Sequence, residues 1–480
     1  IAPRDVVRGN WFGGYRSQRG DPSVLPGFLW NALFDGNNLI QYFALATIET
    51  IFNTDYSLAY YNRWFIDDFK ALLDGPAQLI QRAAYDFDPV AVLHSQSSRH
   101  LAALEGQFGG YDLAHTVLLE ALENLQFHVR YLTERHPELI KYGTTKVIFL
   151  PSCQALSAAT CDALRRFVED GGLLIADVRP GVADAACRFL DDPPLASVFG
   201  VRFGNAPQPG EPDRLEFPPG NTLASVRPDA SVQLAGATSM RSVGNVPVLI
   251  VNKLGRGRAI LLNFGIAQVQ TAGNTPVRRV IARLIEELLQ DAGVQPQAQV
   301  LGDDGRRIPD CRVARFVYGD TVIHGLLLSR GGSSPQACVF TVGRPRHLYD
   351  TLERKYLGYA QRAELKLTPS HGKIICALPD RLSAIEVLAP RAAVCGQRLA
   401  VQVRLRGGGD RHLLRVYAFD PAGRQRYART VVAADGPAQA VIPLALNDPP
   451  GKWMLVARDV ATGVSGSAAI MVAEAGSGGS

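Results

Sequence analysis

Cysteine is the first residue type in this chain that could supply a nucleophile. The sequence contains seven cysteines, and no two of them are spaced Cys-x-x-Cys. Cys153, in "FLPSCQALS", follows an apolar run that predicts a strand, and a turn after a strand can present a nucleophile to substrate. However, "SCQALSAAT" is a long polar stretch without a flanking glycine, and no neighbouring histidine could lower the pKa of the thiol. These residues indicate an unreactive cysteine.

Carboxylates are the second group with catalytic potential, because hydrolysis of a glycosidic bond uses two of them, about 5–9.5 Å apart. Glu49, in "LATIETIF", follows the strand expected at residues 39–43 and could face a cleft, so it is a weak catalytic candidate. The alternative is a solvated carboxylate on a helix. The other acidic residues among the first 54 are Asp5, Asp21 and Asp35, of which the last two read as turn residues.

The sequence lacks other motifs that bind metals, cofactors or nucleic acids. The nine histidines are scattered, and His94 and His100 have no further ligand nearby, so no metal site is predicted. "GRGRA" at 255–259 precedes a strand, which indicates a hairpin and not a dinucleotide loop, so no cofactor is expected. The net charge of +5 is not gathered into a basic block, which argues against nucleic acid. No apolar run reaches the roughly 18 residues of a membrane span.

The elements that would position these residues fall into regions of different pattern. Residues 1–86 hold three of the four tryptophans. Here a helix is expected at "PGFLWNALFDG", a strand at "NLIQYF" and a helix at 56–73. Residues 87–292 alternate apolar strands ("PVAVLHS", "KVIFLP", "LLIADV") with amphipathic helices, among them a helix from Asp112, its expected N-cap, that buries Leu113. This alternation predicts a doubly wound parallel sheet covered on both faces.

The remaining chain predicts an all-β structure. Residues 293–380 and 381–475 show period-two strands and turn signals, which indicate two β-sandwiches with a boundary near "ALPDRLSAIEVLAP". Tyr318-Gly319-Asp320 and Asp420-Pro421-Ala422-Gly423 are expected to be hairpin turns. The final 476–480 segment, "GSGGS", reads as a flexible linker or tag. The fold class is therefore multidomain, α/β followed by all-β.

Several stretches resemble one family when they are taken in order. "DPVAVLHSQSSRHLA", "KVIFLPSCQALSAATCDALRRFVEDGGLLIADVRPG" and "GRGRAILLNFG" resemble the trimerisation domain of glycoside hydrolase family 42 β-galactosidases, a class I amidotransferase-like fold. "HLYDTLERKYLGYAQRAELKLTPSHGKIICALP" resembles the β-sandwich that closes such enzymes. The last module, with "PAGRQRYARTVV" and "PPGKWMLVARDVATG", is similar to macroglobulin-like or Ig-like β modules.

The resemblance gives the first 86 residues a role. In the family a (β/α)₈ barrel precedes the trimerisation domain, and "WFGGYRSQRGDPSVLPGFLWNALFDGNNLIQYF" looks like its seventh strand, helix and eighth strand. A barrel takes about 250 residues, so most of it would be a missing N-terminal segment. No glutamate occurs in "NWFGGYRSQRG", where the family's nucleophile is expected, so no catalytic residue is carried over. Trp11, Tyr15 and Phe43 are candidate sugar-binding aromatics at the barrel mouth, with core packing as the alternative.

Two hypotheses for function follow. In the first, the chain is the C-terminal portion of a bacterial, β-galactosidase-like glycosidase that acts on carbohydrate, supplies part of the barrel mouth and forms a homotrimer. In the second, it is a non-catalytic scaffold or carbohydrate-binding assembly protein built from a degenerate glycosidase. Residues 95–112 and 179–204, expected to be loops, are candidate self-association surfaces, unless their apolar residues cover the sheet of their own chain. Cysteine usage slightly favours a cytoplasmic location and leaves secretion or the periplasm open.

Overall fold

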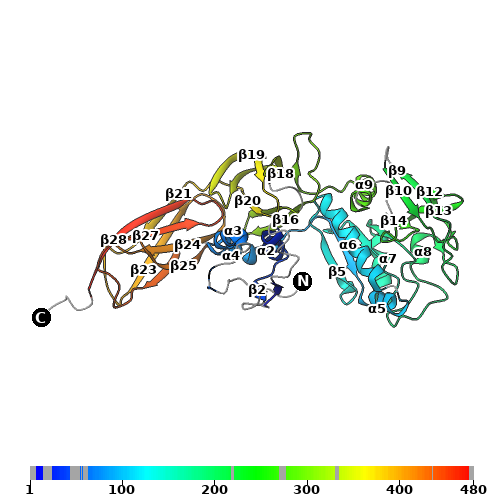
Figure 1. Ribbon diagram of the computed structural model, residues 1–480, viewed down its shortest axis with the longest axis horizontal. Coiled ribbons are helices and arrows are strands. Elements are labelled where there is room, and N and C mark those ends of the chain that lie inside the picture. Colours follow the sequence, from blue (N-terminus) through cyan, green and yellow to red (C-terminus); the bar gives the residue numbers. More distant parts are fainter. Residues whose placement is uncertain are drawn as a thin grey trace. The chain divides into compact units, whose positions relative to one another are not determined.

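The computed structural model divides into two compact units, one from Phe87 to Gln297 and the other combining Ala2–Asp86 with Ala298–Ser480 (Figure 1). It describes residues 7–13, 24–43, 55, 57, 63–106, 108–217, 221–269, 277–329, 334–434 and 436–474.

The first unit contains a seven-stranded sheet in the order β12-β13-β14-β7-β6-β4-β5. The five strands from β14 to β5 are parallel, as predicted, but β13 pairs antiparallel with both β12 and β14, so the sheet is mixed. "GRGRA" forms the predicted hairpin between β13 and β14. The strands are β4 (Val90–His94), β5 (Arg130–Thr133), β6 (Val147–Leu150), β7 (Leu173–Ala176), β12 (Thr238–Val243), β13 (Val246–Leu254) and β14 (Gly257–Leu262).

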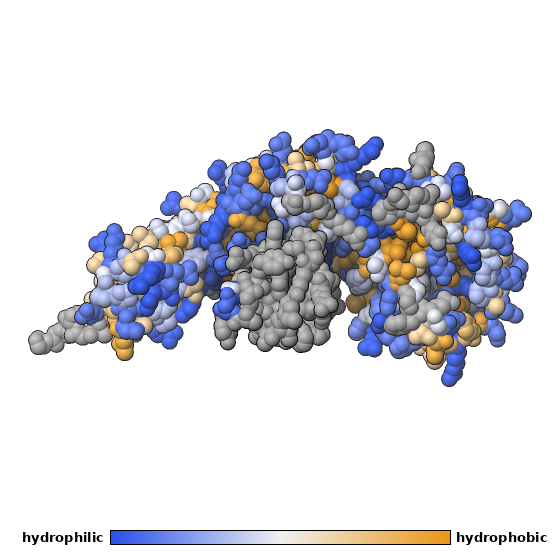
Figure 2. All heavy atoms as spheres, viewed as in Figure 1, coloured by the Kyte–Doolittle hydropathy of each residue, from blue (hydrophilic) through white to orange (hydrophobic). Residues whose placement is uncertain are grey.

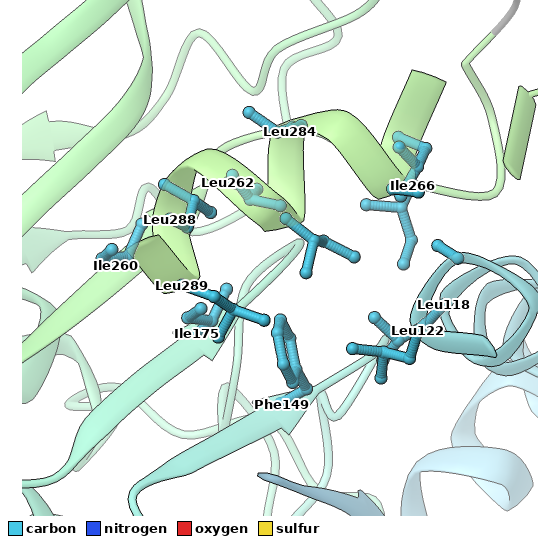
Figure 3. Packing of buried hydrophobic residues seen from close by; sticks show 14 of the residues in the cluster. Leu118, Leu122, Phe149, Ile175, Ile260, Leu262, Ile266, Leu284, Leu288 and Leu289 are labelled. Carbon is cyan, nitrogen blue, oxygen red and sulfur yellow. The ribbon is translucent and has the colours of Figure 1, made fainter. Parts of the chain in front are cut away.

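Helices cover both faces of this sheet, because alternate strand residues are buried on opposite sides. Leu118 and Leu122 of α6 and Leu284 of α9 pack on Phe149 and Ile175 on one face (Figure 3). Helices α7 and α8 pack on the other face, which includes the strand residues Ala91, Leu93, Ile148, Leu150, Leu174, Ala176, Ala259 and Leu261. The helices are α5 (Gln96–Leu104), α6 (Phe108–Asn124), η2 (Pro137–Leu139), α7 (Ala158–Glu169), α8 (Ala196–Phe199) and α9 (Val277–Gln290).

Two predictions for the first helices are wrong. Residues 95–112 are not a loop, since Ser95 caps α5 by accepting a hydrogen bond from the Ser98 N–H. Helix α6 begins at Phe108, so Asp112 lies inside it and pairs with Arg99 at 3.1 Å, and Leu113 is 47% exposed. The buried face starts earlier, at Tyr111, whose burial holds the first turn against the sheet. Between α7 and β12 lie the two-stranded pairs β8–β11 and β9–β10, formed by β8 (Val201–Arg202), β9 (Asp213–Phe217), β10 (Asn221–Val226) and β11 (Gln233–Leu234).

The second unit is built around a sheet in the order β15-β18-β20-β17-β16-β3, with β19 paired to β18. Its strand β3 (Ala84–Tyr85) comes from the N-terminal region and pairs with β16, so the chain before residue 87 contributes directly to this sheet. The predicted Tyr318–Asp320 turn joins β16 and β17. The other strands are β15 (Ala298–Leu301), β16 (Cys311–Tyr318), β17 (Thr321–Leu328), β18 (Gln336–Asp350), β19 (Lys355–Leu367) and β20 (Gly372–Leu378).

Three N-terminal helices form one core with this sheet: α2 (Val24–Phe34), α3 (Arg63–Leu73) and α4 (Pro76–Arg82). Trp30 and Phe34 of α2 are fully buried, and they lie directly over Gly372 and Gly325. A Cβ atom at either glycine would overlap the aromatic ring above it, so the two glycines allow the helix to approach the strands. The described helix α3 begins at Arg63, later than the 56–73 prediction.

The chain closes with two further sheets around a shared core, one in the order β21-β23-β26 and one in the order β22-β28-β27-β24-β25. The predicted turn at Asp420–Gly423 joins β24 and β25, where Asp420 accepts the Arg424 N–H. The strands are β21 (Ala384–Leu388), β22 (Ala392–Val394), β23 (Arg398–Arg406), β24 (Arg411–Phe419), β25 (Gln425–Ala434), β26 (Ala438–Pro443), β27 (Gly451–Asp459) and β28 (Ser465–Ala473).

Asp74, at the end of α3, binds these last strands to the N-terminal helices. Arg458 donates to its carboxylate at 2.6 Å and to its carbonyl at 3.1 Å, Arg354 donates at 3.0 Å, and the Tyr417 hydroxyl also donates to it. Burial raises the pKa of Asp74, but the hydrogen bonds from Tyr417 and Arg458 outweigh it, and the pKa lies below its usual value. The carboxylate therefore stays charged at neutral pH and holds the three partners.

Candidate functional site

The residues expected at a barrel mouth lie on a small parallel pair of strands. β1 (Gly9–Gly13) and β2 (Leu39–Phe43) run parallel, with Trp11 opposite Gln41 and Gly13 opposite Phe43. Helix α2 lies between them in sequence, which is the order that the resemblance predicts for consecutive barrel strands. The side chains of Trp11 and Phe43 lie outside the described residues, as do Tyr15 and Glu49 entirely.

Cys153, the candidate nucleophile, is fully buried after β6. Its Sγ lies 3.6 Å from the Leu93 carbonyl and 3.5 Å from that of Pro151. Burial raises the pKa of the thiol well above its usual value, and the carboxyls of Asp177 and Glu134 raise it further. A buried neutral thiol cannot act as a nucleophile near pH 7.

The carboxyl ends of parallel strands are the usual ligand-binding edge of such a sheet. In this chain the crevice between β4 and β6 is filled by a hydrogen-bonded network. The two Glu134 oxygens accept bonds from the Ser95 hydroxyl (2.8 Å) and from the N–H (2.9 Å) and hydroxyl (3.0 Å) of Ser97. The Ser98 hydroxyl donates to the Ala155 carbonyl at 2.8 Å and accepts from the Ala155 N–H at 2.9 Å.

A group of aromatic side chains lies beneath this network. The Tyr111 hydroxyl accepts the Ser95 N–H at 2.9 Å and lies 3.3 Å from His94 Nδ1. His115 is packed against Tyr111, and burial lowers its pKa, which favours the neutral imidazole at pH 7. These groups therefore contact one another and the network above them.

Two residues just after the strands adopt left-handed backbone conformations, which are uncommon outside glycine. They are Ser152 after β6 (φ +49°) and Arg179 after β7 (φ +46°). The Ser152 N–H donates to Asp177 at 2.5 Å, and burial raises the pKa of that carboxyl to about 7. No motif in the sequence indicated Ser95, Glu134 or Arg179. For Ser95 and Arg179 the available signal is a polar residue shortly after an apolar strand, whereas Glu134 follows the polar strand β5.

A pocket of about 490 Å³ opens at the same edge, beyond β7 and β14. Arg179 in its floor forms a buried ion pair with Asp229 at 2.8 Å and also donates to Ser231 Oγ and the Gly204 carbonyl. Burial raises the pKa of Asp229, but the donors Gln208, Ser231 and Arg179 lower it below its usual value. The charges of Arg179 and Asp229 in the floor of the pocket are therefore paired and held by hydrogen bonds. No sequence motif indicated this arrangement.

The pattern of buried residues in 179–204 favours packing within the chain. Leu195, Val198, Phe199 and Val201 are buried in the core of their own sheet. Phe189 is 63% exposed at the rim of the pocket. In the part of the chain that the structure describes, no three His, Cys, Asp or Glu side chains converge as metal ligands. No described helix is long and apolar enough to cross a membrane.

Comparison with known proteins identifies the central segment. Residues 89–295 match the family model for the β-galactosidase trimerisation domain. No curated protein matches the chain by sequence.

Among solved structures, the chain is similar to the β-galactosidase from Bacillus circulans sp. alkalophilus (14% identity, 74% of this chain and 52% of that chain, TM-score 0.53). It is also similar to a GH42 β-galactosidase from G. stearothermophilus (13%, 74% and 51%, TM-score 0.53) and to the β-galactosidase from Rahnella sp. R3 (13%, 74% and 51%, TM-score 0.53). The chain thus spans about half the length of these enzymes.

At this identity the structural likeness shows the fold alone, which consists of mixed sheets with few helices. The family match adds the identity of the segment that carries the parallel strands. Residues 89–295 therefore match the β-galactosidase trimerisation domain, and the expected resemblance of the chain to the C-terminal part of GH42 β-galactosidases is confirmed.

Proposed function

We propose that this chain is the C-terminal portion of a β-galactosidase-like glycoside hydrolase and that it provides the oligomerisation domain and part of the barrel mouth. The match of residues 89–295 to the trimerisation domain carries this proposal. The parallel pairing of β1 and β2 around α2 supports a barrel end in the N-terminal region. Trp11, Tyr15 and Phe43 are proposed to contact sugar there, and Glu49 is proposed only as a weak catalytic candidate.

The proposed domain partition follows the same reasoning. It places the barrel end at 1–86, the amidotransferase-like trimerisation domain at 87–292, and β-sandwiches at 293–380 and 381–475. We propose that the second of these domains has no open catalytic position; this is supported by the burial of Cys153 and by the Ser95–Glu134 hydrogen bond in the crevice beside it. Assembly needs no open crevice at that position, so the filled crevice between β4 and β6 is consistent with a role in oligomerisation.

Self-association should produce a homotrimer, with each contact burying well over about 1,000 Å². Side chains available for such contacts on the 87–297 unit include Leu104 (76% exposed) and Leu113 (47% exposed). Figure 2 shows hydrophilic residues over most of the visible face, with apolar residues in smaller groups. Light scattering on the chain at tens of micromolar tests the proposal. A mass of three chains is expected, and a monomer would contradict it.

The second hypothesis, a non-catalytic scaffold or carbohydrate-binding assembly protein, rests on the same filled crevice and on the described residues, among which no catalytic carboxylate pair is identified. An assay of glycosidase activity distinguishes the two hypotheses. The chain alone is expected to hydrolyse no aryl β-galactoside, because glycosidases need two positioned carboxyls. The longer enzyme that contains it is expected to do so. Turnover by the chain alone that Glu49→Gln abolishes would make Glu49 catalytic and would overturn this expectation.

A further inference from the structure

The pocket beyond β7 and β14 is separate from the filled crevice between β4 and β6. It lies at the carboxyl edge, where open α/β sheets bind ligands, and its volume of about 490 Å³ is within the range of small-molecule sites. We propose that it binds a neutral saccharide of one or two sugar units. This inference rests on the proposed function in carbohydrate processing, which supplies the ligand class.

The floor of the pocket presents fixed polar groups. Asn263 is 98% buried, and its Nδ2 donates to the Asp229 and Pro247 carbonyls, both at 2.9 Å. Its Oδ1 accepts no hydrogen bond from the described residues, which leaves an oriented acceptor beside the pocket. Arg179 lies next to it, held by Asp229 in a left-handed backbone conformation. Strained residues that are held by their surroundings are common at ligand sites.

The walls supply neutral amides and one exposed ring. The side chains of Gln154, Asn205 and Gln268 line the pocket and form no hydrogen bond with any described residue. Each amide offers both donors and acceptors, which suits hydroxyl groups that also do both. The exposed ring of Phe189 at the rim gives an apolar face for the C–H surface of a sugar ring.

The charges around the pocket balance one another, and this selects the ligand class. Arg179 is paired with Asp229, and the other two charged residues that line the pocket, Arg227 and Glu105, carry one positive and one negative charge. No excess of positive charge is present to favour a phosphate or carboxylate, and no excess of negative charge favours a cation. A neutral polyhydroxyl ligand fits amides and an aromatic face better than a charged one does.

Ligand-observed NMR and calorimetry on the full chain test the proposal, with galactose, lactose and cellobiose as probes and inorganic phosphate as the charged comparison. At least one saccharide should bind, and phosphate should not. Phe189→Ala and Gln154→Ala should each weaken saccharide binding about tenfold. Both side chains are partly exposed, so the variants should fold, which thermal unfolding would verify.

Gln290→Ala and Leu139→Ala serve as matched controls, because both residues are exposed and neither lines the pocket. Both variants should bind saccharide like the parent. Absence of binding by all three saccharides, or equal loss in the control variants, would overturn the proposal. A change of oligomeric mass in Phe189→Ala with no change in saccharide affinity would assign the pocket to a second copy of the chain and would also overturn it. A trimer that binds no saccharide refutes this inference alone, and a monomer that binds one refutes only the trimer.

Discussion

The Arg179–Asp229 ion pair allows one prediction to be worked through in detail. Both side chains are only 8% exposed, and their atoms are 2.8 Å apart. Asp229→Asn removes the charge while keeping an oxygen that can accept the Gln208 and Ser231 N–H groups. Removing one partner of a buried ion pair costs about 3–5 kcal/mol, because the other charge is left uncompensated. Ser231 Oγ and the Gly204 carbonyl still bind Arg179, so we expect about 3 kcal/mol.

The assay should report on this part of the chain, since a protein of several units need not unfold in one step. Hydrogen exchange read by mass spectrometry over residues 204–217 and 221–231 meets this need. A loss of about 3 kcal/mol corresponds to roughly 150-fold faster exchange, provided that the segment opens and closes faster than its open form exchanges. Asp191→Asn is the matched control, because Asp191 is exposed and has no partner among the described residues. Its exchange should not change.

The dependence on pH provides a check with a definite sign. The pKa of Asp229 is lowered in the folded protein, so its contribution is present above the unfolded pKa of about 3.9 and is lost as the pH falls through the folded value. The parent and Asp229→Asn should therefore converge in acid. Combining Asp229→Asn with Arg179→Met should recover part of the loss, because no unpaired charge remains. Unchanged exchange in the single variant, or a double variant no better than it, would refute the reasoning.

Three further predictions follow from other contacts. Gly372→Ala should destabilise the protein by about 1–3 kcal/mol in denaturant unfolding, because the added Cβ would overlap the Trp30 ring. Gly110 is the control: its site in the helix is open, so Gly110→Ala should stabilise the protein by up to about 1 kcal/mol. Cys153 should react with iodoacetamide at pH 7 no faster than a buried thiol, and fast alkylation lost in Cys153→Ser would contradict this. The hydrogen bond to Asp68 raises the pKa of His371. This pair should therefore stabilise the protein below about pH 6.5, and the stabilisation should disappear as the pH rises through the folded pKa. In thermal unfolding, His371→Gln should lack this decrease of stability with rising pH.

Much of the first unit could be predicted because its strands β4, β6 and β7 are buried on both faces. Runs such as "VAVLH" and "VIFL" are continuously apolar, which is typical of strands buried on both faces, and both form strands of the parallel sheet. The expected start of α6 at Asp112 is wrong, because Asp112 is a common N-cap residue type but lies inside the helix. The helix instead starts at Phe108, since the packing of Tyr111 outweighs the low helix propensity of glycine.

The role of the N-terminal helices could not be predicted from local patterns. Pairing of β3 with β16 joins residues more than 200 apart, and the burial of Trp30 depends on a glycine at 372. Neither of these long-range contacts can be recognised from a stretch of a few residues. The same limit applies to the pocket, whose floor brings together Arg179, Asp229 and Asn263 from three separate segments. Each residue taken alone is an ordinary polar residue after a strand or in a turn.

The two halves of the carboxyl edge call for different physical explanations. Between β4 and β6 the serines and Glu134 satisfy one another, so that half is explained by internal packing. Beyond β7 the protein buries an ion pair and leaves Asn263 Oδ1 unpaired among the described residues, although well-packed apolar residues would stabilise such a site equally well. Stability alone therefore does not account for a polar floor beneath an open pocket. A ligand that completes these hydrogen bonds would account for it, and this distinguishes the pocket from the filled crevice beside it.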